Sequence, residues 1–458
     1  MHKNTWSSQL AYILTVAGAT IGFGATWRFP YLVGQNGGGA YVLVFCIAMI
    51  VIGIPMILVE NAIGRRIQKN SVDCFSGVAE NGRPVSPAWK IVGYAGLIGA
   101  FGIMAYYMVI GGWVLNYIYH TTVGGLPISS DLTADVTKSF YANEVIGSPL
   151  AVGAATLIFV IANYIVLTRG VIDGIERVAK ILMPLLFCIM IMMVIRNVTL
   201  SGAMEGIKYY LTPDFSKISL ELFVSVLGQV FFALSLGFGV MITLSCHLRK
   251  DEQLVKISVI TGIVNTLIAV LAGFMIFPAL FTFGIEPNAG PSLVFETLPI
   301  VFSKMSGGTF FMVAFFCLLM MAAFTTSLPN FQVLVVVLEE KFGMSKRGAV
   351  FAVLGTVFIL GNVPSILGDN VWSDVRILGK SIFDAFDDIS ATIFFILTSL
   401  CCAIFVGWVL GAEAKKEILR GSEKHAWFVD IWFFYVKYII PIVIAIVFVS
   451  SFKKAFIS

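Results

Sequence analysis

The chain has 458 residues, of which 58% are hydrophobic and only 12% charged, and its formal net charge at pH 7 is +4. Soluble domains carry about a quarter of their residues as charged side chains, so this composition excludes a soluble enzyme and indicates a membrane protein. The four histidines stand near the ends of apolar runs and the seven cysteines show no zinc-ligand spacing. We therefore expect no haem site, no catalytic metal and no disulfide framework.

Long apolar runs predict eleven membrane spans, because a helix needs about 20 apolar residues to cross a bilayer. The predicted ranges are 8–34, 38–64, 90–121, 148–167, 175–196, 219–247, 255–283, 307–338, 347–363, 383–411 and 428–452. Lys and Arg are about twice as frequent in the inner connecting segments as in the outer ones when the N-terminus is placed inside. This bias predicts a cytoplasmic N-terminus and, with an odd number of spans, a C-terminus outside.

The spans divide into two halves of five. We expect a first repeat over 1–197, a second repeat over 198–412, and an additional C-terminal span over 413–458. Because five is an odd number, the second repeat must be inverted in the membrane relative to the first.

The first span contains residues that a simple membrane helix avoids. Gly18, Gly22 and Gly24 stand in its middle, and Arg28 and Pro30 follow within the apolar run. A helix-interior glycine costs about 1 kcal/mol relative to alanine, and a charge at this depth costs more. One interpretation is a kinked span whose glycines allow close packing. The interpretation we favour is a helix broken around a small charged ligand, because irregular backbone is tolerated at membrane depth where it faces a cavity.

The sixth span repeats this feature. Gly22-Phe23-Gly24 in the first half corresponds to Gly237-Phe238-Gly239 in the second. Paired glycine-interrupted spans at matching positions of two halves indicate a transporter whose binding site lies between structural repeats.

The broken first helix predicts an anion site and a cation site. Free N–H groups near Phe23 and Gly24, together with the start of the following half-helix, suit a carboxylate. No Asp or Glu occurs between residues 16 and 39, so we expect the ligand to bring that charge. In the eighth span, Thr325, Thr326 and Ser327 offer hydroxyl oxygens that suit a hard cation, although such hydroxyls also bond to carbonyls of their own helix.

These motifs resemble a known family. The segment WRFPYLVGQNGGGA, the segment VFFALSLGFG and the Thr-Thr-Ser of the eighth span are similar to those of the neurotransmitter:sodium symporters. The resemblance implies the leucine-transporter fold, an all-α polytopic membrane protein with a 5+5 inverted repeat and discontinuous helices 1 and 6. It also implies sodium-driven uptake of a small amino acid or amine by alternating access.

The resemblance assigns a second sodium site and a substrate site. The sodium ligands would be carbonyls of Gly18, Ile21 and Ala322 and hydroxyls of Thr325 and Thr326. The substrate pocket would be lined by Ala19, Thr20, Phe23, Gly24, Ile103, Tyr107, Phe232, Ser235, Phe238, Thr326 and Asn330. Tyr107 would bind the substrate carboxylate. Gly22 replaces the Asp of amine-transporting relatives, which favours an amino acid.

The resemblance also assigns gates. Arg28 and Asp387 would close the outer side with Phe232 as a lid, and the neighbouring Asp388 is an alternative partner for the arginine. On the inner side, Lys3, Trp6 and Glu340 would hold the N-terminal segment closed.

The family's first sodium site and its chloride site are altered here. Ala25 and Ala233 replace an Asn and a Thr that supply side-chain oxygens to sodium, while Asn265 remains. At the chloride site, Ala269 and Phe45 replace polar residues and only Gln229 is kept. We therefore predict that only the second sodium site works and that chloride is not required. How the substrate carboxylate is balanced stays open.

Phe23, Phe232, Phe238 and Ile103 predict an apolar pocket, which favours neutral hydrophobic or aromatic amino acids. Asn330 has two interpretations of equal weight: its amide bonds a polar substrate tip such as an indole N–H, or it pairs with the backbone beside Pro329.

Other functions are weighed against this prediction. An ion channel would not need matched gates, and an enzyme would need a nucleophile with a base or paired acids, which the motifs do not offer. The alternatives kept are an amino-acid sensor of the same fold that does not transport, and an ion channel. The expected partners are a small neutral amino acid, sodium and the lipid bilayer, without nucleic acid. Compact loops predict a bacterial inner membrane protein, and the oligomeric state is not predicted.

Overall fold

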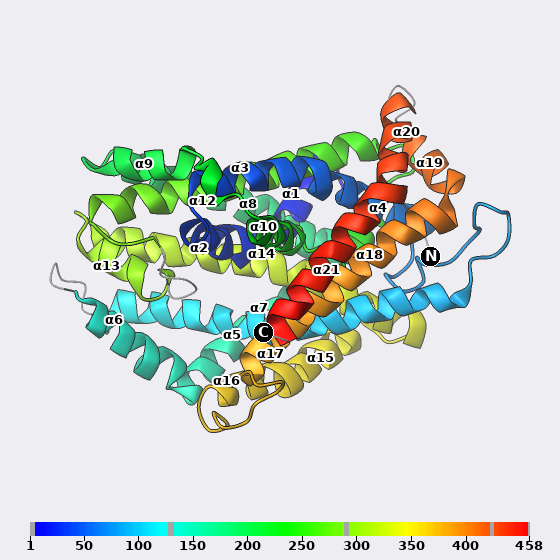
Figure 1. The fold of residues 1–458 in the computed structure, drawn as a ribbon. Helices are drawn as coiled ribbons and strands as arrows, with labels where there is room; N and C mark the ends of the chain where they lie inside the picture. The colour runs from blue at the N-terminus through cyan, green and yellow to red at the C-terminus, as the bar shows by residue number, and fades with distance from the viewer. Residues whose placement is uncertain (1–4, 127–131, 288–292, 422–425, 457–458) are drawn as a thin grey trace.

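The computed structural model describes residues 5–126, 132–287, 293–421 and 426–456. Within these ranges the protein is almost entirely helical and contains no β-strand, only isolated bridges. Most long helices run side by side through the molecule (Figure 1). The short helices α6 (Ala134–Phe140), α9 (Ala203–Leu211) and α13 (Thr297–Ser303) gather at one end, whereas the N-terminus and α19 (Ala412–Leu419) lie at the other.

Nine helical stretches of the described chain are long and apolar enough to cross a membrane. They are Gly39–Ile67, Pro87–Val123, Pro149–Leu167, Val171–Val198, Leu254–Thr282, Gly308–Phe342, Lys346–Gly368, Ile382–Leu410 and Ala426–Phe456. A tenth span is the bent pair Gln9–Thr20 and Gly24–Gln35. The predicted sixth span corresponds to α10 (Leu220–Ala233) and α11 (Val240–Ser245), which are separated by a break. The arrangement agrees with the eleven predicted spans.

Several spans consist of consecutive helical segments. Those used below are α4 (Ile54–Ile67), α5 (Lys90–Val123), α12 (Leu254–Thr282), α14 (Gly308–Phe342), α17 (Ile382–Asp388), the π-helical turn η9 (Ile389–Phe395), α18 (Ile396–Ile404), α20 (Ala426–Phe434) and α21 (Ile440–Phe456).

The first span breaks where its glycines stand. Helix α1 (Gln9–Thr20) begins at Ser8, whose hydroxyl accepts the Ala11 N–H at 3.1 Å, a stabilising N-cap. After Thr20 the chain leaves the helix and resumes as the π-helical turn η1 (Gly24–Arg28) and then α2 (Phe29–Gln35), at a bend of 56°. Pro30 lies in the first turn of α2, where its missing N–H costs little. The predicted discontinuity is confirmed.

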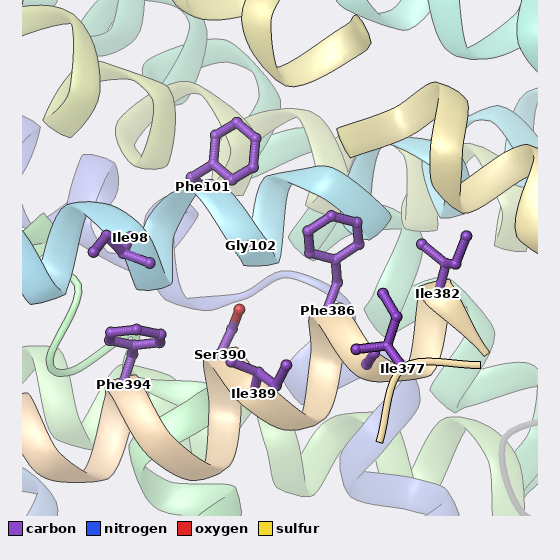
Figure 2. Close-up of a pocket in the computed structure, with 10 residues that line it drawn as sticks. Ile98, Phe101, Gly102, Ile377, Ile382, Phe386, Ile389, Ser390 and Phe394 are labelled. Carbon is purple, nitrogen blue, oxygen red and sulfur yellow. The ribbon is translucent and has the colours of Figure 1, made fainter. Parts of the chain in front are cut away.

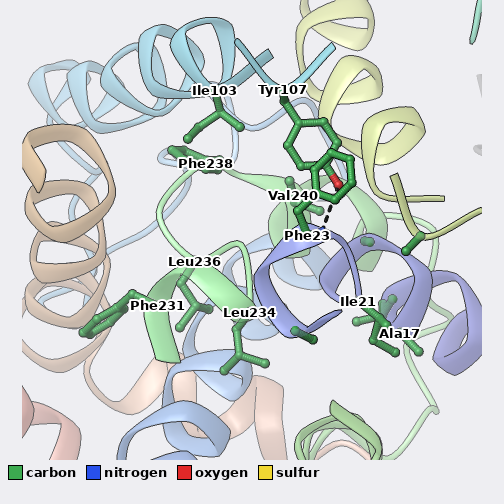
Figure 3. Packing of buried hydrophobic residues seen from close by; sticks show 14 of the residues in the cluster. Ala17, Ile21, Phe23, Ile103, Tyr107, Phe231, Leu234, Leu236, Phe238 and Val240 are labelled. Atoms are coloured by element: carbon green, nitrogen blue, oxygen red, sulfur yellow. Dashed lines mark hydrogen bonds between the residues drawn. The ribbon is translucent and has the colours of Figure 1, made fainter. Parts of the chain in front are cut away.

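The sixth span breaks in a different way. Between α10 and α11 the backbone turns through left-handed conformations at Ser235 (φ +49°), Gly237 (φ +85°) and Gly239 (φ +79°). Residues that carry a side chain rarely adopt these backbone angles, which explains why two of the three positions are glycine. The break of this span packs beside the break of the first one: Phe23 lies against Tyr107 of α5, and Phe238 lies beside Ile103 of the same helix (Figure 3).

Candidate functional site

A small cavity lies where the two breaks meet α5 and α14. Its free volume is about 20 Å³, room for roughly one water molecule. Nine predicted substrate residues line it: Thr20, Gly24, Ile103, Tyr107, Phe232, Ser235, Phe238, Thr326 and Asn330. Gly22 and Phe395 complete the wall, and the sequence had not assigned Phe395. The structure thus brings together residues from five separate spans.

The other two predicted substrate residues lie at the edge of this cavity. The Ala19 carbonyl accepts a hydrogen bond from the Ser235 hydroxyl at 3.3 Å, which joins the two broken helices. Phe23 faces the outer side, and its backbone N–H donates to the Tyr107 hydroxyl at 3.4 Å (Figure 3). A freed N–H group of the first break therefore points at the tyrosine that the sequence assigns to a carboxylate.

Gly22 has no room for a side chain. A Cβ atom there would stand 2.3 Å from the Tyr107 hydroxyl oxygen and 2.6 Å from Oγ1 of Thr326. Real Cβ atoms do not approach so closely, so both hydroxyl groups would have to move. The close approach gives a steric reason for glycine at this position.

Among the described residues, only the nitrogen end of the Asn330 side-chain amide has a hydrogen-bond partner. Its Nδ2 donates to the Thr326 carbonyl at 2.8 Å, in the manner of the backbone-pairing interpretation. Its Oδ1 is buried and has no hydrogen-bond partner among the described residues. Since Asn330 also lines the cavity, an acceptor is left for a donor group on a ligand.

Oxygen atoms cluster where α1 meets α14. The Thr326 hydroxyl donates to the Gly18 carbonyl at 2.8 Å, and the Thr325 hydroxyl donates to the carbonyls of Met321 at 2.9 Å and Ala322 at 3.2 Å. A Cβ on Gly18 would lie 3.1 Å from Cβ of Thr325, so the two helices touch here. Both threonines are buried. Carbonyl and hydroxyl oxygens are the ligands that hard cations prefer.

The region of the altered sodium site has different chemistry. The Gln229 amide nitrogen donates to the Gly24 carbonyl at 2.6 Å, and the Asn265 amide nitrogen donates to the Ala233 carbonyl at 3.3 Å. Ala25, Ala233, Phe45 and Ala269 are fully buried. Two carbonyls of the broken helices are thus occupied by N–H donors of side chains.

A second cavity of about 120 Å³ lies on the outer side of the first. Tyr107 and Phe232 line both cavities and therefore stand between them, while Phe23 lines the outer one. Arg28 and Asp387 line the outer cavity, but the described residues contain no direct ion pair between them. Instead, the Arg28 guanidinium lies 4.3 Å from the centre of the Phe232 ring, and Asp387 accepts a hydrogen bond from the Tyr106 hydroxyl at 2.7 Å.

Asp388, the alternative partner of Arg28, forms an ion pair with Lys380. The two predicted members of the outer gate, Arg28 and Asp387, therefore line the same cavity, but each contacts an aromatic residue, Phe232 or Tyr106, and not the other. Tyr106 was not assigned by the sequence, because a tyrosine in an apolar helix carries no signal of a polar partner.

On the inner side, Lys3 lies outside the described residues. Trp6 is buried, and its indole N–H donates to the Leu244 carbonyl at 3.1 Å while its backbone N–H donates to the His247 carbonyl at 3.4 Å. The N-terminal segment is therefore fastened to the end of α11. Glu340 accepts hydrogen bonds from the Asn70 N–H at 2.7 Å and the Asn70 amide at 3.0 Å.

Glu60 is a buried residue that the sequence analysis missed. This carboxylate on α4 is fully buried and accepts the Gly237 N–H at 2.7 Å, so it holds the break of the sixth span. Its other oxygen has no partner among the described residues. A lone acid within the apolar run 38–64 was a signal that could have identified it.

A further cavity, of about 150 Å³, lies on the other side of α5 (Figure 2). Ile98 of α5 lies opposite Phe394 of the tenth span, and Ser390 supplies the hydroxyl group shown there. The Phe101 ring lies 6.5 Å from the Phe386 ring, centre to centre. A Cβ on Gly102 would stand 2.0 Å from Oγ of Ser390, so these two spans approach closely beside the cavity.

Comparison with known proteins agrees with this arrangement. The family model described as the sodium:neurotransmitter symporter family matches residues 3–148 and 137–457. An uncharacterized sodium-dependent transporter of Haemophilus influenzae is 61% identical over 98% of both chains, and the sodium-dependent transporter YhdH of Bacillus subtilis, also uncharacterized, is 36% identical over 97% of both. The crystal structure of MhsT in complex with L-phenylalanine superposes with a TM-score of 0.87 at 36% identity, covering 98% of this chain and all of that one.

The fold and the central cavity between two broken helices define a polytopic membrane transporter, as predicted. The chain belongs to the sodium:neurotransmitter symporter family. It is therefore a sodium-dependent transporter and not an enzyme, and the predicted fold class is confirmed.

Proposed function

We propose that this protein imports neutral hydrophobic or aromatic amino acids by alternating access, driven by one sodium ion at the second sodium site and without chloride. The observation that carries this proposal is the contrast in donors around the two breaks. Hydroxyl groups meet the carbonyls at Gly18 and Ala322, whereas amide N–H groups meet the carbonyls at Gly24 and Ala233.

A hydroxyl group can turn its hydrogen away and present a lone pair to a cation, because its rotor is free. An amide nitrogen presents only hydrogens. The Thr325–Thr326 cluster can therefore receive sodium by rotation of two hydroxyls, with the Gly18, Ile21 and Ala322 carbonyls as the other ligands. At the altered site, Ala25 and Ala233 offer no side-chain oxygen. A cation there would need the amides of Gln229 and Asn265 to turn over, so that Oε1 and Oδ1, which have no hydrogen-bond partner among the described residues, replace their N–H groups.

The substrate class rests on the central cavity. Gly22 leaves no space for the acidic side chain that would pair an amine, so the ligand must supply its own carboxylate to Tyr107 and the Phe23 N–H. The walls formed by Ile103, Phe232 and Phe238 are apolar. The L-phenylalanine bound in the MhsT complex supports an amino acid of this type.

Binding of a panel of amino acids to purified protein, titrated with sodium in chloride and in gluconate, tests the proposal. We expect binding of hydrophobic or aromatic amino acids that requires sodium, ignores chloride and has a Hill slope near one. A slope near two would contradict the single site, and a requirement for chloride would contradict the role given to Phe45 and Ala269.

A transport-inactive sensor of the same fold predicts the same binding data. Uptake of the bound amino acid into sodium-loaded and sodium-free proteoliposomes separates the two. We expect accumulation that follows an inward sodium gradient, and a sensor would bind without accumulation.

A further inference from the structure

A polar cavity of about 300 Å³ lies away from the transport path, at the inner end of α4. The loop after α4 and helix α19, which connects the tenth and eleventh spans, form its other walls. Three cations line it, Arg66, Lys416 and Arg420, together with the acids Glu413 and Glu417. Charged walls of this kind distinguish it from the apolar cavities between the spans.

The two acids are already engaged. Glu417 is buried, and its carboxylate pairs with Arg65 at 2.7 Å and Arg420 at 3.1 Å. Arg65 also donates to the Glu417 backbone carbonyl, so α4 and α19 are joined at this point. Glu413 forms an exposed ion pair with Lys416 at 2.7 Å, a type of pair that contributes little.

Positive charge remains in excess around the cavity. Burial lowers the pKa of the nearby Lys250 ammonium; Glu417 raises it, and the guanidinium groups of Arg420 and Arg65 lower it. The guanidinium groups of Arg420 and Arg65 therefore repel the Lys250 ammonium, although all three groups lie close to the Glu417 carboxylate. An added anion would relieve this repulsion.

Arg66 is held open toward the cavity. Its terminal nitrogens donate to the backbone carbonyls of Ser76 and, at 3.3 Å, of Val78, which fixes the guanidinium plane. Its Nε is buried and finds no hydrogen-bond partner within the described residues. Because Arg66 lines the cavity and its guanidinium plane is fixed, it suits a phosphate oxygen, which Arg binds strongly.

The cavity lies at the level of the membrane interface. Helix α19 follows directly after the tenth span ends at Leu410, and α20 begins the eleventh span at Ala426. Trp408 and Trp427 flank this connection and are 55% and 69% exposed. Exposed tryptophans concentrate at the headgroup level, and the bias of Lys and Arg predicts that this is the cytoplasmic side.

Apolar side chains adjoin the cations. Ile67 and Val78 line the same cavity, and Val78 is 50% exposed. A free phosphate ion gains nothing from such a wall, whereas the glycerol and first methylene groups of a lipid do.

We propose that this cavity binds the phosphate group of an anionic phospholipid from the inner leaflet, held by Arg66, Lys416 and Arg420. Basic pockets between spans on the cytoplasmic side suit such headgroups. The bound lipid would join α4 to α19 and so stabilise the connection between the tenth and eleventh spans. This inference is independent of the proposed substrate and sodium stoichiometry.

The test uses the full-length protein in nanodiscs of phosphatidylcholine, with and without phosphatidylglycerol. We expect phosphatidylglycerol to raise the thermal transition of the wild type by about 3–6 °C, the shift that a ligand well above its Kd produces. The double variant K416Q/R420Q should lose most of that shift. The matched control K346Q/R347Q, which removes two exposed cations at the start of another inner helix, should keep it.

Two further measurements keep the outcome decisive. Native mass spectrometry should count one retained phosphatidylglycerol on the wild type and fewer on K416Q/R420Q, and the single variant R420Q serves if the double variant is unstable. Inorganic phosphate at millimolar concentration should not reproduce the thermal shift. Equal shifts in K416Q/R420Q and the wild type, or the same shift with inorganic phosphate, would overturn the proposal.

Discussion

The two candidate ion regions beside the broken helices use similar backbone carbonyls but different side-chain donors. At Gly18 and Ala322 the carbonyls face threonine hydroxyls of α14, while at Gly24 and Ala233 they face the amides of Gln229 and Asn265. The first kind of contact can convert into a cation site by rotation of the hydroxyl hydrogen alone, whereas the second would need the whole amide to turn over and give up its bond to the carbonyl. Where the ligand side chains are replaced by Ala25 and Ala233, the remaining carbonyls at Gly24 and Ala233 are satisfied by the retained amides of Gln229 and Asn265.

The amide contacts of Gln229 and Asn265 help to keep the two broken helices stable. A buried carbonyl without a partner costs about 1–3 kcal/mol, so the breaks would be unstable without either an ion or a donor. The amides keep the geometry of the first break where relatives use sodium. Under the proposed stoichiometry, one ion fewer would drive each cycle.

The largest effect is expected at the hydroxyl cluster. Thr326→Val keeps the shape of the side chain but removes an oxygen that lies 2.8 Å from the Gly18 carbonyl. We expect the sodium affinity measured by substrate binding to fall roughly 10- to 100-fold, the range for a lost contact to a charge. Thr15→Val is the control, because the Thr15 hydroxyl bonds only the Ala11 carbonyl of its own helix. Unchanged sodium affinity in Thr326→Val would contradict the proposal that the threonine hydroxyls of α14 bind sodium.

The next effect concerns the space at the first break. Gly22→Ala places a Cβ against the hydroxyls of Tyr107 and Thr326. We expect substrate binding to weaken by at least about 10-fold, since overpacking of this kind costs about 1–3 kcal/mol. Gly228→Ala is the matched control, because a Cβ there meets no atom within 4 Å. Equilibrium binding of radiolabelled amino acid measures both, and equal affinities would show that the two hydroxyls are free to move.

A smaller effect is expected where the amides of Gln229 and Asn265 meet the backbone carbonyls, and it should change thermal stability and not sodium binding. Gln229→Leu leaves the Gly24 carbonyl buried without its donor, at a cost of about 1–3 kcal/mol. The thermal transition in detergent should fall by several degrees while the Hill slope for sodium stays near one. Thr243→Val should leave the transition unchanged, because the Thr243 hydroxyl is buried and has no hydrogen-bond partner among the described residues. A steeper or shallower sodium curve in Gln229→Leu would place an ion at this region.

The smallest effect tests the free oxygen of Asn330. Asn330→Leu removes an acceptor that faces the central cavity. We expect tryptophan or tyrosine to lose about 5- to 10-fold in affinity relative to phenylalanine, the value of one neutral hydrogen bond. Competition binding with the three amino acids gives the ratio. Equal losses for all three would assign Asn330 to the backbone alone.

Much of this architecture could be predicted from the chain. Gly18, Gly22 and Gly24, with Pro30 after them, predict the break of the first span, and the matching Gly237 and Gly239 predict the second. Most of the predicted pocket residues line one cavity, because the motifs that carry the resemblance lie at the breaks themselves.

The remaining features depend on distances between side chains that no pattern of residues encodes. Arg28 and Asp387 share a cavity, yet Phe232 and Tyr106 are their immediate partners. The role of Gln229 is visible only once its amide lies 2.6 Å from the Gly24 carbonyl. Glu60 is marked in the sequence as a lone acid in an apolar run, but its partner, the Gly237 N–H, is visible only in the structure.

The ratio of sodium to substrate carried in each cycle is the most direct test of the single-ion account. In proteoliposomes at zero membrane potential, a fixed sodium gradient is opposed by increasing substrate gradients until net flux stops. We expect the flux to stop when the substrate ratio equals the sodium ratio, which means one sodium ion for each amino acid. Balance at the square of the sodium ratio would mean two sodium ions and would contradict the account.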